Sequence, residues 1–224
     1  KGFAILGDSH AIDLFGVVIS SNTHPFIIGI TQGGCRPHTP KPNCHYDDFL
    51  SFVKDNKSIF NGVVYEQAGF YLLRNKIKKG SRKMFSNVAY DAEINGIYPD
   101  EEHIHSVLEY LSKLAIYTNI IWFGPRIEHH ITMNMILKRQ CDYDFMLRKN
   151  QRAVFEGLDV YLKKLVERTD VLRFVSQNKS FKYRFPVDFM NCNALYWSDG
   201  DHLSALGEEI FGKSFDVLSL FDPQ

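Results

Sequence analysis

Two short segments at opposite ends of the 224-residue sequence contain residues that could perform acyl transfer together. The tetrapeptide GDSH occupies residues 7–10, and Asp199 lies three residues before His202 near the other end. A serine hydroxyl becomes a nucleophile when an adjacent histidine takes its proton, and a carboxylate holds that histidine in the correct tautomer. We therefore predict a catalytic triad of Ser9 as nucleophile, His202 as general base and Asp199 as the residue that orients the base.

Each segment by itself has a simpler interpretation. Serine is a preferred N-cap residue, so Ser9 could serve only to cap a helix. Asp199 and His202 could belong to an ordinary surface loop. Asp201 also competes with Asp199 for the orienting role, although we expect its side chain to point away or to cap the last helix. The two segments together favour the triad.

The rest of the sequence indicates an α/β fold, because short apolar segments alternate with helical ones. The expected strands are 3–6, 25–30, 62–65, 119–123 and 171–175, and the expected helices are 10–21, 46–53, 68–79, 101–116, 145–168 and 203–220. Residues 81–99 are expected to be irregular. Such alternation predicts a three-layer α/β/α domain around a five-stranded parallel sheet.

The predicted topology places the segments with Ser9 and with His202 at one edge of the sheet. Ligands of parallel sheets bind beyond the carboxyl ends of the strands. The loops expected at this rim follow Leu6, Ile30, Tyr65 and Phe123. Ser9 belongs to the first of these loops, and His202 directly precedes the last predicted helix, so we expect both at the same rim.

Composition limits the class of protein. Lys plus Arg and Asp plus Glu are both 26, so the net charge is zero, without the basic excess typical of a nucleic-acid binder. Hydrophobic residues make up 45% of the chain, which excludes a disordered protein. Residues 1–224 fit a single domain. No apolar run reaches the roughly 18 residues needed to span a bilayer. The chain begins at Lys1 rather than Met, so we expect a fragment or a processed form.

The four cysteines are Cys35, Cys44, Cys141 and Cys192, which is compatible with two disulfides or four free thiols. The first two lie in the Pro-rich segment GGCRPHTPKPNC (residues 33–44), where a crosslink would restrict an irregular loop. The other two are distant in sequence, and only the fold can bring them together. No CxxC or HxxxH spacing occurs, so we expect no metal site.

The ordered motifs resemble the SGNH (GDSL-like) hydrolases, and most closely the periplasmic SGNH domain fused to family 3 membrane acyltransferases. The residues that carry this resemblance are GDSHA (7–11), CRP (35–37) with Cys44, FGP (123–125) with Glu128, and DGDHLS (199–204) with Gly207. The resemblance covers both ends of the chain and most strand-end loops. It implies the flavodoxin-like SGNH hydrolase fold for the domain.

The resemblance also implies a function. These domains acetylate bacterial surface polysaccharides such as lipopolysaccharide O-antigen, here through an acyl-serine intermediate. The expected partners are a polysaccharide or oligosaccharide acceptor and a family 3 membrane domain in the same chain, with no nucleic acid. This domain is expected to hold no cofactor, and acetyl-CoA is the ultimate acyl donor through the membrane domain. The expected location is the periplasmic face of the bacterial inner membrane.

Two alternatives remain. An O-acetyl esterase of the same superfamily, acting on carbohydrate or lipid, would use the same triad with water as acceptor. A carbohydrate-binding module with a decayed site would perform no chemistry.

The expected oxyanion hole combines three donors. The backbone N–H of Ser9 lies at a helix N-terminus, which favours negative charge. The resemblance implies a glycine N–H from the loop after the second strand, where we favour Gly34 over Gly33. The family's third donor is the asparagine of a GxND pattern, which this sequence lacks, and Gln67 is the candidate that stands near its place.

Overall fold

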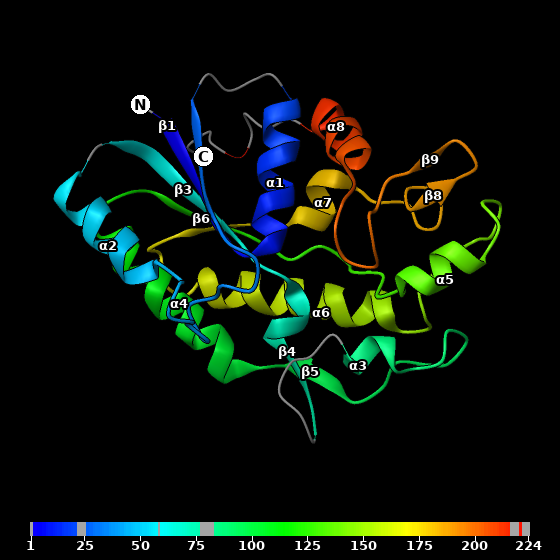
Figure 1. Cartoon of the computed structure of the whole chain (residues 1–224). Helices are drawn as coiled ribbons and strands as arrows, with labels where there is room; N and C mark the ends of the chain where they lie inside the picture. The colour runs from blue at the N-terminus through cyan, green and yellow to red at the C-terminus, as the bar shows by residue number, and fades with distance from the viewer. Residues whose placement is uncertain (1, 22–25, 58, 77–82, 216–219, 221–224) are drawn as a thin grey trace.

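A five-stranded parallel sheet forms the middle layer of the protein, in the order β2-β1-β3-β6-β7 (Figure 1). The computed structural model describes residues 2–21, 26–57, 59–76, 83–215 and 220. The sheet consists of β1 (Gly2–Gly7), β2 (Ile27–Thr31), β3 (Phe60–Glu66), β6 (Ile120–Phe123) and β7 (Arg173–Val175). The α/β fold predicted from the sequence is confirmed, and each of the five expected strands is present.

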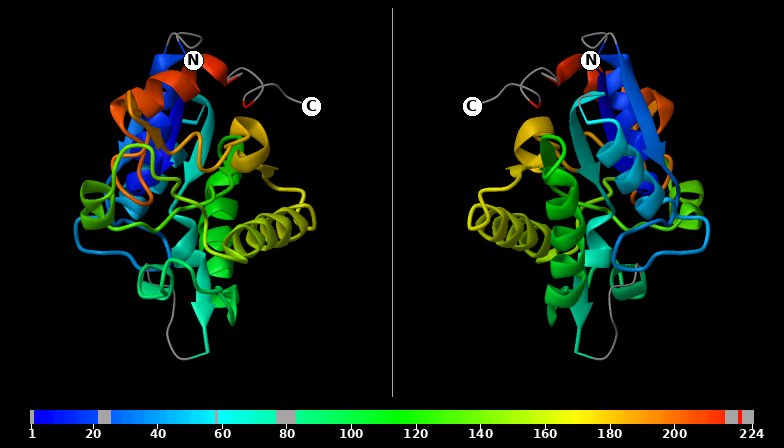
Figure 2. Two further views of the ribbon diagram at one scale, coloured as in Figure 1. Left: turned by 90° about the vertical axis from the view of Figure 1, so that its right-hand side faces the viewer. Right: turned by 90° about the vertical axis from the view of Figure 1, so that its left-hand side faces the viewer.

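Helices cover both faces of this sheet (Figure 2). One face carries α1 (Ser9–Ser20) and α8 (Ala205–Ser214), and the other carries α2 (Tyr46–Asp55), α4 (Glu101–Ala115) and α6 (Gln151–Val166). Successive side chains of a strand point to opposite faces. Ile5 therefore packs in the hydrophobic core under α1 and α8, and Leu6 packs in the core under α2, α4 and α6. Burial on both faces explains why β1 and β6 are continuous apolar runs without alternating polar residues.

The register places the carboxyl ends of the strands at one level. Gly7 pairs with Thr31 of β2 on one side and with Glu66 of β3 on the other. Phe123 pairs with Val175 in the same way at the end of β6. The loops that follow these strands therefore share one rim, as the sequence predicts.

Helix α4 shows how the sequence defines an element. Asp100 caps its N-terminus by accepting a hydrogen bond from the backbone N–H of His103 at 3.4 Å. Glu101 and Glu102 follow in the first turn, where negative charge is favourable. The buried side chains recur every three or four residues: Ile104, Val107, Leu108, Leu111 and Leu114.

The helix expected over residues 68–79 is wrong within the described residues. A 3-10 turn, η1 (Gly69–Leu72), leads directly into β4 (Leu73–Asn75), which pairs antiparallel with β5 (Ile97–Pro99). The backbone N–H groups of Gly69 and Phe70 bind the buried carboxylate of Glu128. This long-range contact fixes the backbone in a way that local apolar spacing does not reveal. Residues 77–82 of the expected helix lie outside the described part of the chain.

Other boundaries also differ from the expectation. Helix α6 begins at Gln151, because Asn150 takes a left-handed conformation with φ of 65° and interrupts the predicted helix. Helix α8 begins at Ala205, after Ser204 caps it by accepting a hydrogen bond from the N–H of Gly207 at 3.0 Å. The short elements not expected are α3 (Lys83–Ser86), α5 (Met133–Lys138), α7 (Gln177–Phe181), β8 (Met190–Asn191) and β9 (Ala194–Leu195).

Two disulfides, Cys35–Cys44 and Cys141–Cys192, are formed, so the structure decides for two disulfides over four free thiols and brings the distant second pair together. They close segments of 9 and 51 residues. Disulfides persist in oxidising compartments, so the two bonds are consistent with an extracytoplasmic location. Among the residues that the structure describes, no helix combines the length and apolarity needed to cross a membrane.

Removing either disulfide should destabilise the domain, and the longer loop should matter more. The loss of chain entropy in the unfolded state gives roughly 4 kcal/mol for Cys141–Cys192 and about 3 kcal/mol for Cys35–Cys44. Paired Cys→Ser variants at each bond can be compared by urea unfolding without reductant. Equal or reversed losses would show that strain or residual unfolded-state structure decides the order.

Candidate active site

The turn between β1 and α1 is built on Gly7. Its φ is 151°, and a Cβ atom there would lie 1.8 Å from the carbonyl oxygen of Glu66 and 2.8 Å from the Cβ of Ala11. Only glycine fits this close approach between β1, β3 and the first turn of α1. Ser9 is consequently held at the rim as the first residue of α1.

Asp8, and not Ser9, caps helix α1. The Asp8 carboxylate accepts hydrogen bonds from the N–H of His10 at 3.0 Å and from the N–H of Ala68 at 3.2 Å. Burial raises the pKa of Asp8 to about 6, although these two hydrogen bonds and the charge of Arg36 act in the opposite direction. The interpretation of Ser9 as a mere N-cap is therefore wrong, and its hydroxyl is available for another contact.

The Asp199–His202 turn is fixed by its own hydrogen bonds and by the neighbouring loop. Asp199 Oδ1 accepts hydrogen bonds from the backbone N–H of Asp201 at 2.9 Å and of His202 at 2.8 Å. A Cβ atom at Gly200 would lie 2.3 Å from the backbone nitrogen of Ile131, so a larger residue there would push the turn off the loop after β6.

The fold brings the three residues of the predicted triad into one hydrogen-bonded line. The Oγ atom of Ser9 lies 2.9 Å from Nε2 of His202. The other ring nitrogen, Nδ1, lies 3.0 Å from Oδ2 and 3.1 Å from Oδ1 of Asp199. The His202 and Asp199 side chains keep 26% and 27% of their surface exposed, so a substrate can approach the histidine.

Electrostatics in this line strengthen His202 as a base. Burial lowers the pKa of His202, but the hydrogen bond to Asp199 and the charges of Asp201, Asp199 and Asp13 outweigh it, so this pKa lies above its ordinary value. Burial raises the pKa of Asp199, but its hydrogen bonds with His202 and with the Asp201 N–H outweigh burial, so this pKa lies below its ordinary value. Asp199 therefore stays ionised beside a ring that can accept a proton on Nε2.

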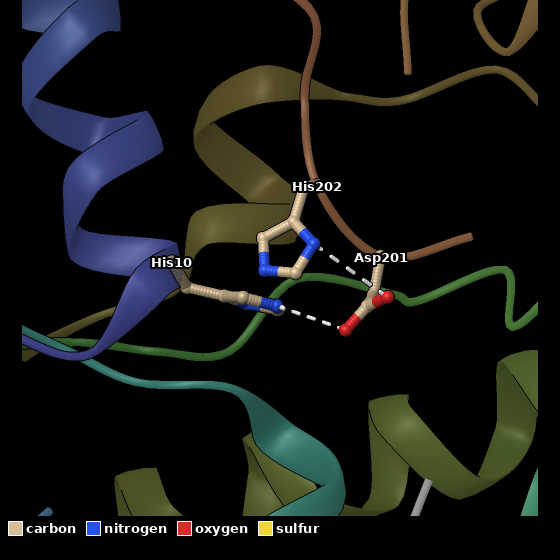
Figure 3. Close-up of side chains that lie close together, drawn as sticks. All are labelled: His10, Asp201 and His202. Atoms are coloured by element: carbon tan, nitrogen blue, oxygen red, sulfur yellow. Dashed lines mark ion pairs between the residues drawn. The ribbon is translucent and has the colours of Figure 1, made fainter. Parts of the chain in front are cut away.

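The side chain of Asp201 points toward His10 and His202 rather than away from them (Figure 3). It is 2% exposed, with Oδ1 at 3.8 Å from Nδ1 of His202 and Oδ2 at 3.8 Å from Nε2 of His10. The expectation that it points away or caps the last helix is wrong, because the cap is Ser204. Asp199 is nearer to the ring and hydrogen-bonded to it, which fits the orienting role better.

A buried polar layer that sequence reasoning missed lies beneath the site. His10 is fully buried on α1, and its ring meets that of His202 edge-on at 5.4 Å. Glu128 is also fully buried and lies 2.7 Å from Nε2 of His130. Burial raises the pKa of Glu128 well above its ordinary value. The sequence signals for this layer were the motif positions of His10 and Glu128, to which sequence reasoning gave no role.

A second buried pair joins the two halves of the site. The carboxylate of Asp13 on α1 contacts the guanidinium of Arg126 and accepts a hydrogen bond from the backbone N–H of Leu203 at 2.9 Å. It thereby ties α1 to the residue that follows His202. Ser9 and His202 are consequently held on two segments that share a carboxylate.

Two of the expected oxyanion donors lie in loops beside the first strand. Gly34, with φ of 78°, lies in the turn after β2, and the N–H of Gln32 in the same loop donates to the carbonyl of Gly7 at 3.1 Å. Gln67 is buried, and its Oε1 accepts a hydrogen bond from the hydroxyl of Tyr65 at 2.5 Å. Its Nε2 is buried without a hydrogen-bond partner in the described structure, so it retains a free donor.

The comparisons with known proteins show the fold. No family model matches the sequence, and no curated protein matches it. Two solved structures are similar at a TM-score of 0.50 each: a candidate SGNH hydrolase from Slackia heliotrinireducens and Est24, a carbohydrate acetylesterase from Sinorhizobium meliloti. The first is 13% identical over 96% of both chains, and the second is 10% identical over 96% of this chain and 95% of Est24. The chain therefore has an α/β fold like that of the SGNH hydrolases, which the sequence motifs implied.

Proposed function

We propose that this domain is a serine-dependent O-acyltransferase that acetylates a bacterial surface polysaccharide such as lipopolysaccharide O-antigen. The observation that carries the proposal is the 2.9 Å contact between Ser9 Oγ and His202 Nε2, with Asp199 on the other ring nitrogen. Serine, histidine and carboxylate in this geometry are the parts needed for acyl transfer.

In the first step His202 takes the proton of Ser9 while Oγ attacks the carbonyl carbon of the acyl donor. The imidazolium that forms is stabilised by ionised Asp199. When the tetrahedral intermediate collapses, the bond to the leaving group breaks and His202 gives its proton to that group. The product is an ester of Ser9, and His202 is again neutral.

In the second step an acceptor hydroxyl gives its proton to His202 and attacks the acyl-serine. The ester bond to Ser9 breaks, and the proton returns from His202 to the serine oxygen. A sugar hydroxyl as acceptor gives acyl transfer, whereas water gives hydrolysis. The same residues serve both outcomes, so the acceptor alone separates the two activities.

The oxyanion of each tetrahedral intermediate would rest on N–H donors at the rim. The first N–H groups of a helix have no intrahelical partner, and Ser9 is the first residue of α1. We assign the second donor to the N–H of Gly34 and the third to Nε2 of Gln67, whose donor is unused. Gln67 directly precedes Ala68, which binds Asp8, so it lies on the segment that adjoins the serine turn.

The choice of acyltransferase over esterase rests on the motifs at 35–37, 123–125 and 199–204. On this proposal the chain is one SGNH domain of a longer family 3 membrane acyltransferase, located at the periplasmic face, with the acyl group supplied from acetyl-CoA through the membrane domain. An O-acetyl esterase is the second candidate, and the fold similarity to the carbohydrate acetylesterase Est24 favours it. The hydrogen-bonded triad argues against a non-catalytic binding module.

The acceptor decides between the two activities. We incubate the protein with a chromogenic acetyl ester and an O-antigen-type oligosaccharide, and measure acetylated sugar by mass spectrometry beside free acetate. We expect acetyl transfer to sugar to exceed release to water, and Ser9→Ala to abolish both products. Acetate alone in the presence of saturating sugar would establish the esterase.

The two carboxylates beside His202 should differ in importance. Asp199→Asn should lower kcat by about 10⁴-fold, because it removes the carboxylate that fixes the tautomer. Asp201→Asn, its matched control, should have a far smaller effect, since its nearest oxygen lies 3.8 Å from the ring. Steady-state kinetics and a thermal melt of each variant check this. The reverse order would reassign the orienting role to Asp201.

Gln67→Leu should lower kcat by roughly 10²- to 10³-fold with little change in KM, which is the typical effect of removing one oxyanion donor. The control is Tyr65→Phe, which removes the other hydrogen bond of Gln67 but leaves Nε2 in place. Its kcat should stay close to that of the wild type. Equal effects of the two variants would indicate a structural role for the Gln67 side chain.

A further inference from the structure

A cluster of potential metal ligands lies on the buried side of the triad, and only its His202 member takes part in the proposed mechanism (Figure 3). It consists of His10, Asp201 and His202, each of which offers one ligand atom, and these atoms all lie within 4.8 Å of one another. His10 comes from α1, whereas the other two come from the loop before α8. The cluster therefore exists only because the two ends of the chain meet.

His10 is the unexplained member of this cluster. Its side chain is fully buried, and neither ring nitrogen has a hydrogen-bond partner in the described structure. Buried polar groups are nearly always hydrogen-bonded, because leaving one unpaired is costly. The Nε2 atom faces Oδ2 of Asp201 at 3.8 Å, which is too long for a hydrogen bond. An ion between these atoms would give the His10 nitrogen the partner that it lacks.

We propose that His10, Asp201 and His202 bind a divalent transition-metal ion of the zinc type, and that the bound ion holds the enzyme inactive. Two imidazoles and one carboxylate form a donor set that zinc accepts, with water as a fourth ligand. Ligands at about 2.1 Å from a tetrahedral ion are about 3.4 Å apart. The two 3.8 Å separations, one from each oxygen of Asp201, are close to this value, and all three ligand atoms lie within 4.8 Å of one another, so side-chain shifts of about 1 Å would complete the site.

The charges around the cluster suit a cation. Ionised Asp199 adjoins His202, and the carboxyl of Glu128 faces Nδ1 of His10 at 3.9 Å on the side away from Asp201. The nearby positive charge of Arg126 is paired with Asp13. The side chain of His202 keeps 26% of its surface exposed, so one of the three ligands borders solvent.

The inhibitory effect rests on the proposed function and follows from the chemistry of imidazole. If the ion binds Nδ1, the remaining ring proton must sit on Nε2, which then cannot accept the proton of Ser9. If the ion binds Nε2 instead, the lone pair needed for that proton is already used. Either way His202 ceases to be a general base until the ion leaves.

The test combines binding with activity. Protein stripped with EDTA is titrated with ZnCl₂ by isothermal titration calorimetry, and hydrolysis of a chromogenic acetyl ester is followed in parallel. We expect one tightly bound zinc, at least a tenfold loss of activity at saturation, and recovery on addition of EDTA. Absence of stoichiometric binding would overturn the site, and binding without loss of activity would overturn its inhibitory role.

Variants locate the ion. His10→Gln and the nearly isosteric Asp201→Asn should each weaken zinc binding at least tenfold. Because both variants are measured, the test still decides if one of them fails to fold. His105→Gln is the matched control, since His105 is exposed on α4, and its affinity should equal that of the wild type. Unchanged affinity in both cluster variants would place the ion elsewhere and overturn the proposal.

Ser9→Ala separates this proposal from the proposed function. That variant lacks the nucleophile but keeps all three ligands, so calorimetry should still detect the zinc. A wild-type protein that binds zinc at this site but, freed of zinc, neither hydrolyses the ester nor transfers acetyl to sugar would refute the proposed function while confirming the ligands. An active enzyme indifferent to zinc would refute only the metal site.

Discussion

The hydrogen bond between Ser9 and His202 is the contact on which the rest of the site depends. It joins two segments at opposite ends of the chain, and neither segment has any local reason to approach the other. The contact holds because β1 ends against β3 at Gly7, where no side chain would fit, so that α1 starts at the rim. The turn at Gly200 packs against the backbone of Ile131 so closely that a side chain would not fit there either. Small shifts of either backbone would separate the two side chains.

Hydrogen bonds to buried carboxyl groups hold the segments that carry Ser9 and His202 in place. Asp8 binds the N–H of Ala68, Asp13 binds the N–H of Leu203, and Glu128 binds the N–H of Gly69. Asp8 and Glu128 connect the loops after β1 and β6 to the loop after β3, and Asp13 connects helix α1 to the loop before α8. A buried charge is costly unless it is paired and hydrogen-bonded, so these contacts act only in the fully assembled fold. The inner side of the rim is consequently tied together by buried hydrogen bonds, while His202 keeps 26% of its side-chain surface exposed on the outer side.

His202 stands between two sets of partners. On the outer side it faces Ser9 and Asp199, the groups of the proposed chemistry. On the inner side it faces Asp201 and His10, which the proposed reaction does not use. The same imidazole nitrogens serve both sides, so occupancy of one set must affect the other. This shared residue gives a simple physical basis by which binding beneath the site would control chemistry above it.

The sequence by itself determined the α/β class, the five strands and the identity of the triad candidates. The fold class, the strands and the triad candidates depend on local apolar runs and on motif residues next to strand ends, and both can be read directly from the sequence. Only the tertiary structure decided that Asp8 rather than Ser9 caps α1, that residues 69–75 form a turn and a strand, and that Asp201 is buried against His10. Each of these outcomes depends on a partner far away in the chain, and the free energy of such a contact is absent from any local window of sequence.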